Sequence, residues 1–152
     1  MLPAEVFATV ISSTPLISVD LLIVNTRGEL LLGKRNNKPA QGSWFVPGGR
    51  VFKNESIAQA ISRISQSELG VSLAQKNGSF KGHFEHFYQD SVINDDIDTH
   101  YVVLAYHYEV SDDLVISPCS QHIELSWHRP SDVQTSEDVH CYTKAYLEYI
   151  GC

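Results

Sequence analysis

The sequence has little cysteine and no long apolar run, and each shortage excludes a class of protein. The 152 residues contain three cysteines, Cys119, Cys141 and Cys152, whose odd number and wide spacing form neither a metal-binding pattern nor a disulfide framework. We therefore expect a reducing, cytoplasmic environment. No apolar run approaches the length that spans a membrane, and the first residues lack a basic segment followed by an apolar core. We expect neither membrane association nor a secretory signal.

Positive charge is also scarce. Eleven lysines and arginines face 18 acidic residues, which gives a formal net charge of −7. A nucleic-acid backbone is therefore not an expected partner, and an anionic ligand would have to be bound by a few local cations. The length and the 43% hydrophobic content are typical of a globular domain, and we expect a single domain at residues 1–152.

The stretch between residues 48 and 71 carries the strongest local pattern. Glycines punctuate both of its ends, and isoleucines at helical spacing predict a helix from about Glu55 to Leu69. Glu68 falls within about 40° of that apolar stripe, in the last turn, where the helix dipole repels negative charge. A bound cation would stabilise the carboxylate there. The alternative is that the stripe frays and Glu68 reaches water.

The pattern of the rest of the chain predicts strands, with a helix near each end of the sequence. The expected elements are a short helix opening at Pro3, strands at Leu16–Val24, Glu29–Lys34, Trp44–Val46, Ser79–Tyr88, Thr99–Val110 and Ile123–Trp127, and a helix from Ser136 to Tyr149. An acidic loop at residues 90–98 joins two of the strands.

Three polar residues have unusual surroundings in this pattern. Asp20 shares a strand face with apolar neighbours, and both a pairing with Arg35 or a loop cap and a role in a site remain open. Arg35 leaves its strand into a polar loop, where it is either solvated or available to a phosphate through its planar guanidinium. Arg63 lies two helical turns after Glu55, which favours a structural pairing.

The spacing around the predicted helix resembles the Nudix box. The matching positions are Gly49, Glu55, Arg63, Glu68, Gly70 and Val71, while Ile64 and Ser67 stand where the box has glutamates and Ser65 replaces an aliphatic residue. A narrower resemblance is to the GDP-mannose mannosyl hydrolases, Nudix-fold enzymes that cut at the sugar carbon. It is carried by the altered box, by Lys34-Arg35, by residues 44–50 and by Gln121-His122.

This resemblance implies an α/β fold, an α/β/α sandwich around a mixed sheet. It also implies hydrolysis of a GDP-hexose, GDP-mannose first and GDP-glucose second, to GDP and free sugar by inverting attack of water at the anomeric carbon. One Mg²⁺, for which Mn²⁺ can substitute, would be held by Gly48, Glu68 and Gln121. Family members are homodimers, so a homodimer is expected.

The resemblance also assigns roles to individual residues. His122 would be the general base, and Arg35, Arg50 and Tyr101 would bind or stabilise the diphosphate. Asp20 would lie near the sugar or the catalytic histidine. The remaining implied contacts are Leu2 and Phe7, with the guanosine, and His86, near the site.

Two other functions remain open. A conventional Nudix pyrophosphohydrolase would release GMP and a sugar 1-phosphate, but the missing glutamates at Ile64 and Ser67 argue against it. A nucleotide-binding module without catalysis is the other alternative, and the retention of Glu68, Gln121 and His122 argues against that.

Overall fold

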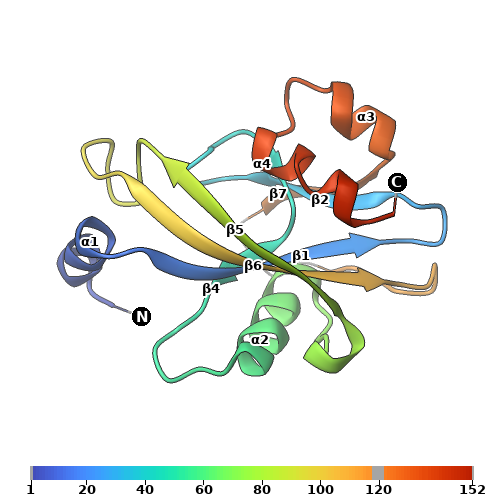
Figure 1. Ribbon diagram of the computed structural model, residues 1–152, viewed down its shortest axis with the longest axis horizontal. Helices are drawn as coiled ribbons and strands as arrows, with labels where there is room; N and C mark the ends of the chain where they lie inside the picture. Colours follow the sequence, from blue (N-terminus) through green and yellow to red (C-terminus); the bar gives the residue numbers. More distant parts are fainter. Residues whose placement is uncertain (1, 118–121, 152) are drawn as a thin grey trace.

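The computed structural model describes residues 2–117 and 122–151, apart from the side chains of His122 and Ile123 (Figure 1). Within these ranges, strands follow a first helix, and a second helix separates these strands from the later ones. Their bounds are α1 Ala4–Ser13, β1 Leu16–Val24, β2 Leu30–Arg35, β3 Trp44–Phe45, β4 Gly48–Arg50, α2 Ile57–Leu69, the 3-10 turn η1 Gln75–Asn77, β5 Ser79–Tyr88, β6 Thr99–Glu109, β7 His122–His128, α3 Pro130–Thr135, α4 Cys141–Lys144 and the 3-10 turn η2 Leu147–Tyr149.

The described strands form one seven-stranded mixed sheet. Its main path runs β3-β2-β1-β6-β5, and β4 pairs with β1 while β7 pairs with β2. β1 and β6 are parallel, and the other pairs are antiparallel. On its other side, β1 pairs with β4 at Ser18–Asp20 and with β2 only at Val24. This change of partner brings the short glycine-rich strand β4 beside Asp20.

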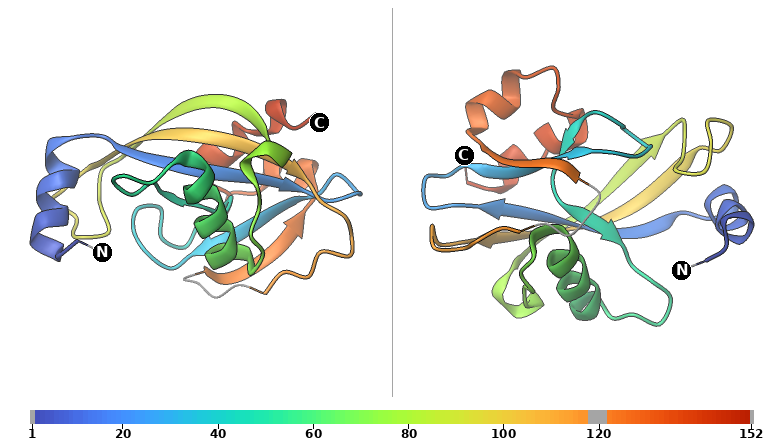
Figure 2. Two further views of the ribbon diagram at one scale, coloured as in Figure 1. Left: turned by 90° about the horizontal axis from the view of Figure 1, so that it is seen from below. Right: turned by 180° about the vertical axis from the view of Figure 1, so that it is seen from behind.

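Helices cover both faces of the sheet (Figures 1 and 2). On one face Ile61 and Ile64 of α2 pack in a buried cluster with Leu21 of β1. On the other face Tyr146, from the C-terminal segment, packs in a second cluster with Leu22. Successive strand residues point to opposite faces, so β1 is buried from both sides. The predicted α/β/α sandwich around a mixed sheet is confirmed.

Helix α2 begins two residues later than predicted because a capping box fixes its start. The backbone N–H of Gln59 donates to Ser56 Oγ at 3.1 Å, and the Ser56 N–H donates to Gln59 Oε1 at 2.9 Å. Gly70 ends the helix in the left-handed conformation, at φ 74°. The cap therefore leaves Glu55 outside the helix, free to pair with a residue within it.

The single helix predicted from Ser136 to Tyr149 is wrong. The segment between α3 and α4 is extended and runs beside β3, where the Trp44 N–H donates to Asp138 O at 2.8 Å and the His140 N–H donates to Trp44 O at 3.1 Å. Backbone groups engaged with a strand cannot also form helical hydrogen bonds. The apolar spacing that suggested one helix comes from side chains that pack on the sheet from separate turns.

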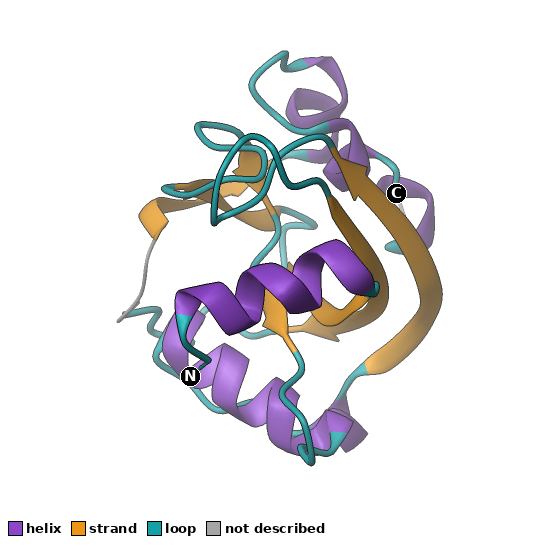
Figure 3. Cartoon of the chain, turned by 90° about the vertical axis from the view of Figure 1, so that its left-hand side faces the viewer, coloured by secondary structure: helices purple, strands orange, loops and turns teal. Residues whose placement is uncertain are grey.

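The other predicted elements are confirmed, with bounds that differ by at most two residues. β4 is not indicated by the sequence pattern, and β7 begins at His122, which was expected in a loop. Helix α1 lies across one end of the sheet, and Ile11 is its buried residue (Figures 1 and 3). None of the helices in the described ranges combines the length and the apolar character needed to cross a bilayer.

Candidate active site

A cavity of about 550 Å³ opens where β1, β4, α2 and the aromatic ends of β5 and β6 meet. The residues around it come from segments that are far apart in the sequence. Seven of the residues that the sequence assigned to a site line this cavity: Asp20, Arg35, Gly48, Arg50, Glu68, His86 and Tyr101. The fold therefore gathers most of the predicted set in one place.

Two arginines provide positive charge to this cavity. Arg35 ends β2, and its Nε donates to Pro39 O at 2.8 Å while its Cζ lies 5.8 Å from the centroid of the Phe45 ring. Arg50 ends β4, with its Cζ 4.3 Å from the centroid of the Phe7 ring. Neither guanidinium forms an ion pair with a carboxylate of the described residues. Both keep N–H donors for an anion, in a chain whose net charge is −7.

A third arginine, Arg63, also lines the cavity, but its guanidinium is engaged with the protein. Its Nε lies 2.7 Å from Glu55 Oε1, and its Nη2 donates to Glu55 Oε2 at 2.9 Å and to Arg50 O at 2.7 Å. The hydrogen bonds from Arg63 hold the pKa of Glu55 below its ordinary value. The predicted structural pairing is confirmed, and it fixes the loop that leads into α2.

Asp20 is buried in the wall of the cavity, with 7% of its surface exposed. Its hydrogen-bond partner is Tyr146, whose hydroxyl donates to Oδ2 at 2.5 Å. Burial raises the pKa of Asp20 to about 6, and the hydrogen bond from Tyr146 and the charge of Arg35 limit the rise. Arg35, one of the alternative partners for Asp20, therefore acts on it through its charge, and the direct hydrogen bond comes from a tyrosine of the C-terminal segment.

Gly48 faces Asp20 across the pairing of β4 with β1. A Cβ at this position would lie 2.5 Å from Asp20 Oδ1 and 2.6 Å from Val19 O, so the packing here admits only glycine. Glu68 lines the same cavity, and its Oε2 is shielded from solvent. A backbone carbonyl and a carboxylate are oxygen donors of the kind that Mg²⁺ takes, usually with waters and substrate oxygens. The two described members of the predicted metal site therefore fit the ion by chemistry and location.

Glu68 is the one acidic residue of α2, and no group of three or more His, Cys, Asp or Glu side chains within the described residues is placed to hold a metal. The carboxylate cluster of the usual Nudix box is thus missing from the described part of the chain.

Aromatic side chains form the far wall of the cavity. His86, 4% exposed, stacks on Tyr142 with ring centroids 4.1 Å apart and planes within 4°. Burial, reinforced by the nearby His140, lowers the pKa of His86 to about 4, so this ring is neutral at physiological pH. Burial also raises the pKa of Tyr88 and of Tyr101, which keeps both hydroxyls protonated.

The other four predicted residues lie elsewhere or cannot be placed. Gln121 lies outside the described residues, and for His122 the structure describes the main chain, which pairs with Arg35 in the β2–β7 register. Leu2 is exposed, and neither it nor Phe7 lines the cavity. The contact of Phe7 is with Arg50.

Among the residues that sequence reasoning missed, two affect the geometry of the site. Tyr146, assigned to packing alone, is the donor to Asp20. Phe52 lines the cavity and lies against Arg63, with Cζ 3.8 Å from its ring centroid. A buried carboxylate requires a donor, and this requirement was the available signal for a tyrosine among the C-terminal apolar positions.

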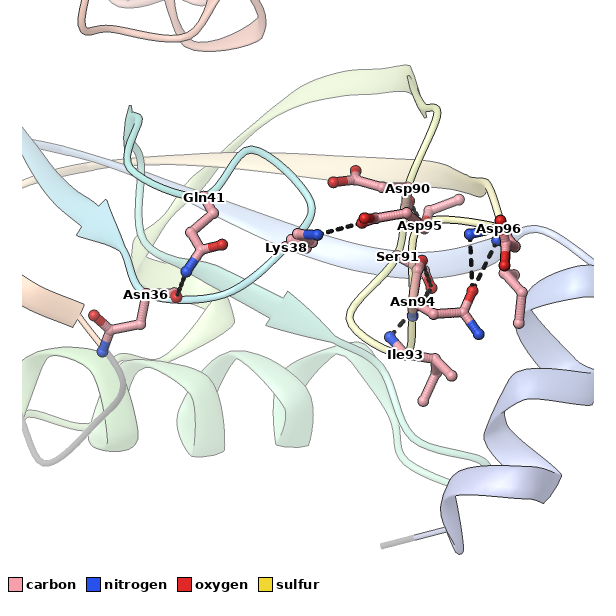
Figure 4. A network of polar contacts seen from close by, with 11 residues as sticks. Asn36, Lys38, Gln41, Asp90, Ser91, Ile93, Asn94, Asp95 and Asp96 are labelled. Carbon is pink, nitrogen blue, oxygen red and sulfur yellow. Dashed lines mark hydrogen bonds and ion pairs between the residues drawn. The ribbon is translucent and has the colours of Figure 1, made fainter.

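Two loops meet beside the cavity (Figure 4). Lys38, next to the cavity residue Pro39, forms an ion pair with Asp95 of the acidic loop. That loop is held by its own side chains: Ser91 Oγ accepts from the Asn94 N–H at 3.2 Å, and Asn94 Oδ1 accepts from the backbone two and three residues later. The acidic segment therefore forms an ordered turn tied to the loop that follows β2.

Comparison with known proteins gives a consistent set of similarities. Residues 14–148 match the NUDIX domain. The low-salt glycan biosynthesis protein Agl8 of Haloferax volcanii is 37% identical over 147 residues, covering 97% of this chain and 89% of its own length. The crystal structure of the MutT protein from Methanosarcina mazei Go1 superimposes with a TM-score of 0.70 at 25% identity, over 91% of this chain and 94% of that one. That of the MutT NUDIX hydrolase from Burkholderia pseudomallei gives 0.69 at 26% identity, over 90% and 98%.

Proposed function

The chain belongs to the NUDIX family, and from this premise we propose that it hydrolyses a GDP-hexose to GDP and free sugar, with GDP-mannose as the first candidate and GDP-glucose as the second. Membership supports a hydrolase acting on a nucleoside diphosphate derivative. The finer assignment rests on one observation: α2 carries a single carboxylate, Glu68, where the usual box has several. Attack at phosphorus in the family depends on a cluster of carboxylates around more than one divalent ion.

Cleavage at the sugar carbon does not require the protein to activate a phosphorus atom for attack by water. The diphosphate is already a good leaving group, so it needs charge neutralisation more than protonation. Arg35 and Arg50 line the cavity, and each has N–H donors without a partner among the described residues that can share the charge developing on GDP. Tyr101, whose burial raises its pKa, is held in the protonated form that can donate a hydrogen bond to the same oxygens. Gly48, Glu68 and Gln121 would hold one Mg²⁺ or Mn²⁺, which supplies further positive charge to the diphosphate.

The proposed general base is His122. Its main chain pairs with Arg35, which puts the backbone of this residue next to a wall of the cavity. A histidine suits removal of a proton from attacking water near neutral pH, a contribution on the order of 10²–10⁴-fold. Asp20 would contact the sugar or orient the base. A single displacement inverts the anomeric carbon, so an α-linked substrate should release β-sugar.

Three further properties belong to this proposal. The name of the Haloferax volcanii relative refers to glycan biosynthesis, and a sugar-nucleotide substrate would connect this chain to the same area of metabolism. The exposed apolar side chains Leu2 and Val6 at α1 support a homodimer with α1 at the seam. We also propose that residues 1–152 act as a single cytoplasmic domain.

The second candidate is a conventional pyrophosphohydrolase that releases GMP and a sugar 1-phosphate. Family membership favours it, because that is the chemistry with which the usual Nudix box is associated. The two candidates differ in the atom that water attacks.

Hydrolysis in ¹⁸O-enriched water separates them. A panel of GDP- and UDP-sugars is incubated with the protein and Mg²⁺, and products are resolved by mass spectrometry and NMR. The proposal requires GDP as the nucleotide product and the label in the released hexose, initially as the β-anomer. Unlabelled hexose and GDP, each incubated with the protein for the same time, correct for exchange of oxygen with water. GMP as the nucleotide product, with the label in a phosphate group of GMP or of the sugar 1-phosphate, would establish the second candidate. Tight binding without turnover would leave a binding module.

A further inference from the structure

The guanidinium of Arg50 lies among aromatic rings instead of carboxylates. Its Cζ is 4.3 Å from the centroid of Phe7, on α1, and 5.3 Å from the centroid of Phe52, in the loop after β4. Both distances are within the range of cation–π attraction. The described residues provide no hydrogen bond or ion pair to this guanidinium. Contact with the rings is therefore what restricts its orientation.

The two rings are not equally well held. Phe52 is 40% exposed, but Arg63 contacts its ring, with Cζ 3.8 Å from the centroid, and its backbone N–H donates to Glu55 Oε2 at 2.9 Å. The same Arg63 donates to the main-chain oxygen of Arg50 at 2.7 Å. Arg63 thus links Phe52 and the main chain of Arg50 to α2.

Phe7 belongs to a helix that is attached more lightly. α1 lies across one end of the sheet and buries Ile11, while Val6 remains 44% exposed (Figure 3). Arg50 and Phe52 line the cavity, but Phe7 does not. Its ring can influence the cavity through the arginine that it touches.

We propose that Phe7 is a positioning residue that acts through Arg50, holding its guanidinium where it can bind a diphosphate. This inference rests on the anion-binding role that the proposed function gives to Arg50, and it assigns Phe7 a task that does not require contact with the nucleoside. An arginine side chain has many rotamers. A ring packed against the guanidinium excludes some of these rotamers before the anion binds, so less conformational entropy is lost on binding.

Inorganic pyrophosphate is the probe that separates this role from contact with a base, because it has no nucleoside. Its affinity and that of GDP are measured by isothermal titration calorimetry in Mg²⁺ buffer. Phe7→Leu keeps an apolar side chain but removes the ring, and should weaken both ligands by about two- to five-fold, the loss that an exposed cation–π contact represents. Phe7→Tyr keeps the ring and should bind both as the parent does. Phe80→Leu, at a 54% exposed phenylalanine in β5 outside the cavity lining, is the matched control.

A double-mutant cycle with Arg50→Ala completes the test. In that background Phe7→Leu should have no further effect on pyrophosphate, because the side chain through which it acts is gone. Weaker GDP binding with unchanged pyrophosphate binding would overturn the inference and place Phe7 against the nucleoside. Unchanged affinities for both ligands would reduce Phe7 to a packing residue. If Arg50→Ala itself leaves pyrophosphate affinity intact, the proposed anion site fails, and the inference fails with it.

Discussion

Replacing His86 by phenylalanine should change how the stability of the protein depends on pH. His86 is 4% exposed and stacks on Tyr142, and burial lowers its pKa to about 4. Phenylalanine keeps an aromatic ring in this stack and removes the group that titrates. The difference between variant and parent therefore isolates the proton that binds to His86 in the unfolded chain.

The sign and size follow from the two pKa values. Unfolded histidine has its ordinary pKa of 6.5, and the folded value is about 4, so between these pH values the unfolded chain binds a proton that the native protein excludes. The stability that neutral His86 provides is complete above pH 6.5 and is lost as pH falls toward 4. At 1.36 kcal/mol for each pH unit, the loss is about 3 kcal/mol.

Asp20 should act in the opposite direction. Its pKa rises from 3.8 to about 6 on folding, so in this window the native protein binds a proton that the unfolded chain releases, and stability falls as pH rises. The same arithmetic gives about 3 kcal/mol. In the parent protein the two groups therefore offset each other, and the pH dependence that they cause together is smaller than either effect alone.

Urea unfolding followed by tryptophan fluorescence from pH 7 to pH 4 measures both differences. Relative to the parent, His86→Phe should gain about 3 kcal/mol on acidification, and Asp20→Asn should lose a similar amount. Phe84→Leu, in the same strand and against Tyr146, removes an aromatic side chain without removing a titrating group, so its cost should be uniform with pH. A His86→Phe difference that stays constant within about 0.5 kcal/mol across this range would refute the assignment of a buried neutral histidine.

Two further predictions concern the backbone and the ion pair beneath the cavity. Gly48→Ala should cost about 1–3 kcal/mol more than Gly49→Ala in urea unfolding. At position 48 the new Cβ meets fixed backbone and a buried carboxylate at 2.5–2.6 Å, whereas at position 49 its nearest contact is Ile64 Cγ1 at 3.0 Å, which a shift of a few tenths of an ångström relieves. Equal costs would contradict the close approach of β4 to β1. Glu55→Gln should lower the free energy of unfolding by about 1 kcal/mol, since the Glu55 side chain is 13% exposed and is held bidentately by Arg63. Glu29→Gln should lower it by less, because Glu29 pairs with an arginine whose side chain is 67% exposed. The reverse order would show that the Arg63 pair does not hold the loop before α2.

The sequence alone predicted α2 and the described strands other than β4, because their signals are local. Hydrophobic periodicity and the terminal Gly70 lie within the segment that they shape. Glu68 was expected at the end of an apolar stripe for the same reason, and the structure puts it in the cavity wall. The separation of Glu55 and Arg63 by two helical turns was sufficient to predict their ion pair.

The C-terminal segment could not be predicted in this way. Its residues have helical spacing, but the main chain around Asp138 pairs with Trp44, nearly a hundred residues earlier, and that pairing is invisible to a local pattern. The donor to Asp20 was missed for a related reason. Asp20 and Tyr146 are separated by 126 positions, and the need for a partner can be inferred from burial while its identity cannot.

The position of the site follows from the change of partner on one side of β1, which pairs with β4 near its start and with β2 at its end. A strand that paired with β2 along its whole length would leave no place for β4 beside Asp20, and Gly48 would not face that carboxylate. On the other side, the parallel pairing with β6 brings Tyr101 to the start of β1. Oxygen donors for a cation and N–H donors for an anion are therefore collected at one break in the sheet. The cavity keeps its charged groups although α2 has a single carboxylate, because the arginines and Asp20 come from strands. The reaction that we propose, at carbon instead of phosphorus, depends on this independence of the strand residues from α2.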